Sequence, residues 1–172
     1  MTIKRPIAVT LLAWLAMLGW DLLLHGGLLA GFYVSDDPVL VSPSEAFQRI
    51  PLGYASFLLL AMLLVWLMPR FDLSDGRAAF GFGFKLGALL WGAFILGLIS
   101  IVRFDPVLGA AWFAGQTLEL GIGALVVQRA AAAVSLRRPA WQVLGFIFVC
   151  VIITVMLQSL GLAPAVTIPA PL

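Results

Sequence analysis

Five long apolar stretches constrain the fold of this chain more than any other feature. Each is close to or above the minimum of about 17 residues that a helix needs to cross the hydrocarbon core of a bilayer. No stretch alternates with the two-residue period of a strand, so we expect helices and not barrel strands. The sequence predicts an all-α polytopic transmembrane bundle with spans at Ile7–Phe32, Leu52–Met68, Ala78–Val102, Leu108–Gln128 and Ala140–Leu162.

The composition is typical of a membrane protein. Of the 172 residues, 63% are hydrophobic and only 10% are charged, whereas soluble domains have about 45–50% apolar and 25% charged residues. The basic residues lie beside the spans and form no patch, which argues against a nucleic-acid partner and leaves the lipid bilayer as the expected one. Residues 1–162 are expected to form one bundle, with no second, soluble domain.

The residues at and between the ends of the spans allow further structural predictions. The first span is too long for the apolar part of a cleaved signal peptide, so we expect it to stay in the protein. Residues 44–49 are expected to form a short turn in an outer loop that also holds Asp36 and Asp37, before Pro51 starts the second span. The tail, residues 163–172, is uncharged and is expected to be flexible. Prolines are predicted to mark span ends, at Pro51, Pro69, Pro106, Pro139 and Pro164.

The distribution of basic residues predicts the orientation. One set of loops and termini collects Lys4, Arg5, Arg70, Arg77, Arg129, Arg137 and Arg138, and the other set has only Arg49 and Arg103. The positive-inside rule then places the N-terminus in the cytoplasm and the C-terminus outside. We therefore expect a multi-pass protein of the cell membrane.

Ionisable side chains inside three of the spans predict a polar interior. Asp21 and His25 are four residues apart and share one face of the first helix. Glu119 lies in the small-residue register of Ala111, Gly115 and Gly123, and Lys85 lies in that of Gly81, Ala88 and Gly92. At 1.5 Å per residue, Asp21 and Glu119 are each about 16 Å from the outer ends of their helices, and Gln116 is at a level similar to that of His25. The two carboxylates are therefore expected to be neighbours, with Lys85 as a counter-ion nearer the cytoplasm.

The charges of this cluster suggest coupled titration. Two ionised acids and one protonated lysine sum to −1, so either His25 is protonated or the two acids share a proton. Such a site could relay protons, bind a cationic or hydrogen-bonding solute, or hold a divalent metal. The metal is the weaker hypothesis, because one histidine and two carboxylates lack the local spacing of a known motif, and a haem on His25 is equally unsupported. We therefore predict no cofactor.

A structural interpretation stands beside the functional one. Polar groups within membranes often act as interhelical links worth about 0.6 kcal/mol each, and Lys85 could simply extend to the headgroups. Cys150, the single cysteine, lies in an apolar span where a structural thiol is the default, and it permits no intrachain disulfide. Gln158 and Thr154 are interpreted as helix contacts.

Two segments carry a resemblance to a known family. These are the run from Trp20 through Asp21, His25 and Gly26 to Tyr33, and the run from Trp112 through Gly115 to Glu119. With the glycine-rich third helix between them, residues 7–129 resemble small bacterial four-helix integral membrane proteins of unknown function, similar to the DUF1761-type proteins. The resemblance implies an inner-membrane four-helix core whose polar positions are Asp21, His25, Gly26 and Glu119, with no activity attached. The fifth span departs from that pattern.

Two functions remain open from the sequence, and neither requires an enzymatic reaction. The first is the handling of protons or a small solute at the site formed by Asp21, His25, Glu119, Lys85 and Gln116. The second is a structural or accessory subunit, in a homo-oligomer or with a membrane-protein partner, in which the polar residues link helices. Short loops and small size motivate the second.

Overall fold

Five long helices make up most of the molecule. The computed structural model describes residues 3–34, 40–103 and 105–164, and no strand occurs among them. The helices are α1 (Pro6–Leu23), α2 (Pro43–Leu67), α3 (Gly76–Ile101), α4 (Pro106–Ala132) and α5 (Arg137–Ser159). Each belongs to a segment that is long and apolar enough to cross a membrane. The prediction of an all-helical fold with five helices long and apolar enough to cross a membrane is confirmed. Asp36, Asp37 and residues 165–172 lie outside the described residues.

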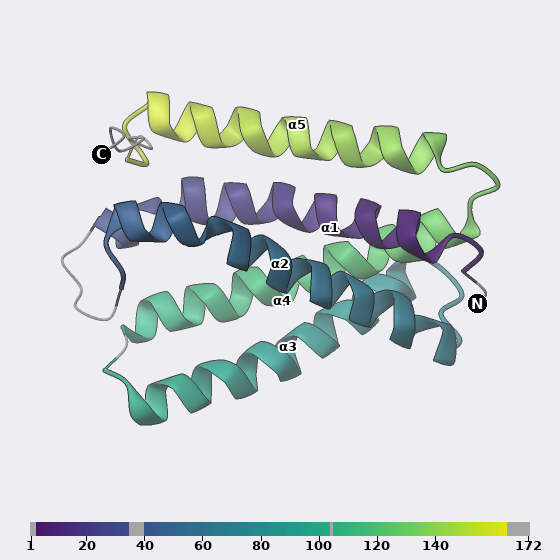
Figure 1. The fold of residues 1–172 in the computed structure, drawn as a ribbon, viewed down its shortest axis with the longest axis horizontal. Helices are drawn as coiled ribbons and strands as arrows, with labels where there is room; N and C mark the ends of the chain where they lie inside the picture. The colour runs from purple at the N-terminus through teal and green to yellow at the C-terminus, as the bar shows by residue number, and fades with distance from the viewer. Residues whose placement is uncertain (1–2, 35–39, 104, 165–172) are drawn as a thin grey trace.

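Consecutive helices run antiparallel (Figure 1). The start of α1, the α2–α3 connection and the α4–α5 connection therefore lie at one end of the bundle, which we call the basic end. It carries Lys4, Arg5, Arg70, Arg77, Arg129, Arg137 and Arg138. The far end holds residues 29–34, residues 40–42, the α3–α4 connection and the end of α5.

The helix starts follow simple local chemistry. Pro6, Pro43 and Pro106 stand in the first turns of α1, α2 and α4, where a missing backbone N–H does no harm. The side chains of Asp75 and Asp105 accept backbone hydrogen bonds at the starts of α3 and α4.

The start of the second span differs from the prediction. α2 begins at Pro43 and not near residue 52, and it absorbs the turn expected at residues 44–49. Ser42 caps it by accepting a hydrogen bond from the backbone N–H of Glu45, and Ser-x-x-Glu is a recognised signal for a helix start. Pro51 therefore lies inside the helix, where its surroundings are exposed. It does not mark the start of the span.

α4 is the centre of the bundle. α3 packs on one side of it, α1 packs on another, and α5 contacts mainly α1. A Cβ atom at Gly87 of α3 would lie 2.9 Å from the backbone of Thr117, and one at Gly123 of α4 would lie 2.9 Å from Met17 of α1. Small residues thus let both neighbours approach α4 closely.

The small-residue registers expected from the sequence are only partly correct. The α4 register with Gly115 and Gly123 faces α1, as predicted. On α3, however, Gly83 and Gly87 face α4, whereas Gly81 meets no atom within 4 Å. Gly81 and Lys85 therefore face away from α4, whereas a Cβ atom at Gly92 in the same register would lie 3.5 Å from Phe113 of α4.

Candidate intramembrane polar site

Asp21 and His25 form the start of a polar cluster between α1 and α4. Asp21 lies in the last turn of α1, and His25 follows in a π-helical turn, Leu24–Leu28. The His25 Nε2 atom lies 3.3 Å from the Asp21 Oδ1 atom. Both side chains are mostly covered, with 29% of His25 and 17% of Asp21 exposed. The predicted pairing along one helix face is therefore present.

The π-helical turn ties this region to α5. The Leu29 N–H donates to the Leu24 carbonyl five residues back, which is one residue further than in an α-helix. The wider turn changes which backbone groups pair within the helix. The Gly26 carbonyl accepts a hydrogen bond from the Gln158 side-chain amide of α5 at 2.9 Å. Such turns are frequent at functional sites.

Tyr33 closes the cluster toward the far end. A short 3₁₀ helix, Ala30–Val34, brings its hydroxyl to 2.5 Å from the His25 Nδ1 atom. The Trp112 indole N–H of α4 donates to the same hydroxyl at 2.7 Å. Burial raises the pKa of Tyr33 to about 12; the Trp112 hydrogen bond lowers it and the negative charge of Asp21 raises it further. Tyr33 is therefore a neutral phenol at physiological pH.

These contacts favour one protonation pattern for His25. An indole N–H can only donate, so the Tyr33 hydroxyl accepts from Trp112 and is free to donate to Nδ1. The proton of the neutral ring then sits on Nε2, which faces Asp21. The Gln116 amide nitrogen lies 3.2 Å from Nε2 and also donates a hydrogen bond to the Asp21 carboxylate, so Gln116 contacts both members of the pair. His25 is thus held through both ring nitrogens.

Glu119 lies one turn along α4 from Gln116, in the middle of the bundle. Its side chain is 0% exposed, and neither carboxyl oxygen has a hydrogen-bond partner among the described residues. The hydroxyl of Thr117 and the side-chain oxygen of Gln116 are also buried and unpaired. This stretch of α4 therefore lacks hydrogen-bond partners among the described residues. Burying the unpaired carboxyl group of Glu119 lowers the stability of the fold more than burying the other two groups does.

The remaining predicted site residue lies elsewhere. Lys85 is exposed on α3, and the ion pairs among the described residues are His25 with Asp21 and Arg49 with Glu45. The interpretation of Lys85 as a counter-ion of the carboxylates therefore has no contact to support it. Extension of its long side chain toward the headgroups agrees with the exposure.

No metal centre can be built from the residues that the structure describes. They contain no group of three or more histidine, cysteine, aspartate or glutamate side chains able to hold a metal ion together. Cys150 is buried on α5 as a free thiol, and the Thr154 hydroxyl donates to its carbonyl at 2.9 Å.

The sequence analysis assigned no role in the site to Tyr33, Trp112 or Trp20. Gln158, which it interpreted as a helix contact, does make one through the Gly26 carbonyl. In the structure the Trp20 indole N–H donates to the Gly115 carbonyl at 2.9 Å and links α1 to α4. Tyr33 reaches His25 only because the chain leaves α-helical geometry after Leu23. The Gly26–Gly27 pair directly after His25 was the available signal for that change.

Comparison with protein-family models, curated proteins and solved structures finds no match to this chain. The functional argument therefore depends on the residues and their geometry.

Proposed function

We propose that this chain is a small proton-handling protein of the cell membrane, with its basic end in the cytoplasm. Glu119 binds a proton in the middle of the bundle and exchanges it with the far end through Asp21 and His25. The observation that carries the proposal is the Glu119 carboxyl group, which is fully buried and has no donor for either oxygen. An ionised carboxylate in that position would cost several kcal/mol, so a proton is its simplest partner.

The contacts suggest an order of exchange. Tyr33 at the far end shares a hydrogen bond with one nitrogen of His25, and the other nitrogen of His25 faces Asp21. Histidine with both nitrogens engaged can take a proton on one side and release one on the other. Asp21 is then the last group before Glu119, and their electrostatic interaction couples the two titrations.

Packing favours a proton over a larger solute. A Cβ atom at Gly115 would overlap the Leu24 side chain, and one at Gly123 would lie 2.9 Å from Met17, so the chain packs closely against α4 one turn to either side of Glu119. A proton moves along hydrogen bonds and needs no cavity of its own.

The test compares Glu119→Gln with the wild type in proteoliposomes that carry a pH-sensitive dye inside. Glutamine keeps the shape of the side chain but cannot exchange a proton, so proton flux under an imposed pH gradient should fall at least ten-fold. Glu45→Gln is the matched control, because Glu45 is exposed at the start of α2 and pairs only with Arg49. It should leave the flux unchanged.

Infrared difference spectroscopy measures the proton on Glu119 directly. A change of buffer pH should alter a carboxylic-acid carbonyl band that is absent in Glu119→Gln, and His25→Gln should slow that change. Wild-type flux in the Glu119→Gln variant, or an unchanged acid band, would contradict the proposal.

A structural or accessory subunit is the second candidate, and the interhelical hydrogen bonds favour it. Trp20 with Gly115 joins α1 to α4, and Gln158 with Gly26 joins α5 to the π-helical turn. This role predicts a copy of the chain or another membrane protein that co-purifies in mild detergent, with Glu119→Gln still assembled. It does not explain an unpaired Glu119, which links no helices. Kinship with the DUF1761-type proteins stays a prediction.

A further inference from the structure

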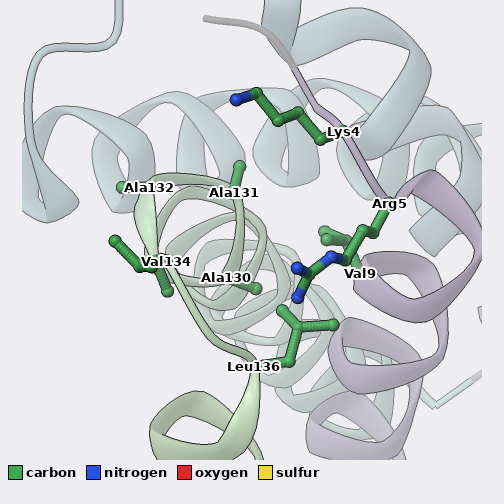
Figure 2. Close-up of a pocket in the computed structure, with 9 residues that line it drawn as sticks. Lys4, Arg5, Val9, Ala130, Ala131, Ala132, Val134 and Leu136 are labelled. Carbon is green, nitrogen blue, oxygen red and sulfur yellow. The ribbon is translucent and has the colours of Figure 1, made fainter.

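A pocket at the basic end lies far along the bundle from the polar site. Its volume is about 300 Å³, and it is formed by the start of α1, the end of α4 and the α4–α5 connection. Figure 2 shows the Arg5 guanidinium reaching into this pocket beside Ala130 and Leu136, while Lys4 lies along its rim. The α4 side of the pocket is made of alanines, so short side chains leave the space open.

The two cationic side chains of this pocket have no acidic partner. The ion pairs among the described residues involve neither Lys4 nor Arg5. Only Asp72 and Asp75 offset the seven basic residues of this end, and Asp75 caps α3. The planar Arg5 guanidinium can bind a phosphate through paired N–H groups, and the Lys4 ammonium, which points away from it in Figure 2, adds a second positive charge at the same pocket.

A second, apolar groove lies further along the bundle, and it shares no lining residue with this pocket. Its volume is about 160 Å³, and it lies between α4 and α5 with Ala16 of α1 as its floor. The groove exists because α5 packs on α1 and makes few contacts with α4. Its walls include Ile122, Val126, Val143 and Phe146.

The pocket and the groove lie along the same helix faces. On α4, Ala130 of the pocket is followed at four-residue steps by Val126 and Ile122 of the groove. On α1, Val9 of the pocket and Ala16 of the groove are two helical turns apart. A cationic pocket at the end of the bundle and an apolar groove nearer its middle therefore share the same faces of α1 and α4.

We propose that one membrane phospholipid occupies both parts. Its phosphate binds Arg5 and Lys4, and one acyl chain lies in the groove between α4 and α5. A free phosphate would leave the groove empty, and an apolar molecule would leave the two charges unpaired; a phospholipid matches both. This inference is independent of proton handling, because no residue of the polar site takes part.

The first experiment measures retained phospholipid. The protein is reconstituted with a mixture of phosphatidylglycerol and phosphatidylcholine and extracted in mild detergent. Native mass spectrometry then measures how many phospholipid molecules stay bound to each chain. The wild type should retain one phospholipid per chain. Each removed charge is expected to weaken retention about five-fold, so Arg5→Gln combined with Lys4→Gln should lose most of it. Arg103→Gln, at the far end, is the matched control and should retain the lipid, and Arg5→Lys should retain part of it.

The second experiment tests the groove at one position. Val126→Phe fills the space and should expel the lipid, whereas Val126→Ala leaves it open and should retain it. Inorganic phosphate added in excess should not displace the lipid. The proposal is overturned if the wild type retains none, if the charge variants retain as much as Arg103→Gln, if Val126→Phe retains as much as Val126→Ala, or if inorganic phosphate competes.

Discussion

Single side chains decide the chemistry of this protein, and Glu119 is the most informative. An unsatisfied buried polar group costs about 1–3 kcal/mol and a charged one costs more. A leucine would fit the surrounding apolar environment better. A residue that lowers stability at the centre of the most buried helix is typical of a functional site. Asp21 and His25 differ, because both have partners and are partly exposed.

Tyr33 gives a pH-dependent prediction. Its pKa is raised from an ordinary value of 10.0 to about 12. In the unfolded chain the phenol would lose its proton first, so the free energy of unfolding should fall as the pH rises from about 10 to about 12. The protein has two tyrosines, so in Tyr54→Phe the ultraviolet absorbance of tyrosinate reports Tyr33 alone and should rise around pH 12. A midpoint near 10 would show that the Tyr33 hydroxyl is not buried in the cluster.

Helix faces decide how closely the elements approach. α3 has several glycines, but only Gly83 and Gly87 meet the backbone of α4. The π-helical turn after α1 is equally specific, because it turns His25 toward Tyr33 and frees the Gly26 carbonyl for Gln158. Local departures from regular α-helix thus position the polar cluster.

Substitutions of two glycines in α3 should distinguish the effect of a lost helix–helix contact on stability from the effect of helix propensity. Gly83→Ala places a methyl group against the Leu120 carbonyl and the Ala124 side chain, and we expect it to lower the free energy of unfolding by about 1–3 kcal/mol. Gly81→Ala meets no atom within 4 Å and should be neutral or slightly stabilising. Thermal unfolding in detergent measures both. Equal effects would mean that α3 does not pack on α4 through Gly83.

The arrangement of all five helices gives the two ends of the bundle different side chains. Antiparallel connections collect seven basic residues at one end, and the polar cluster lies nearer the other, where Tyr33 covers it. If the positive-inside rule holds, protons would enter from outside the cell and the proposed phospholipid would belong to the cytoplasmic leaflet.

Thiol labelling tests this orientation. On a Cys150→Ala background, Val41→Cys marks the far end and Ser74→Cys marks the basic end. A membrane-impermeant reagent added to intact cells should label Val41→Cys at least ten-fold more than Ser74→Cys. Both should react after the membrane is permeabilised. The reverse pattern would place the basic end outside.

Much of the fold was predictable from the sequence because a membrane imposes simple rules. Apolar segments of sufficient length must form helices that satisfy their own backbone hydrogen bonds, so the number of spans followed from hydropathy. Asp21 and His25 on one helix face, and Glu119 facing protein, followed from helical periodicity. The early start of α2 was also encoded, in the Ser42 and Glu45 capping pattern.

Only tertiary packing decided which helix faces meet and which polar side chains find partners. Periodicity indicates which residues share a face but not which face meets a neighbour. For Lys85 the sequence therefore left two positions open, beside the carboxylates or extended toward the headgroups, and the structure has it exposed. Contacts such as Tyr33 with His25 depend on turns that differ little in local free energy from an α-helix. The unpaired state of Glu119 and the open groove beside α5 are also properties of the assembled bundle. Both depend on which side chains other helices bring, and no single segment contains that information.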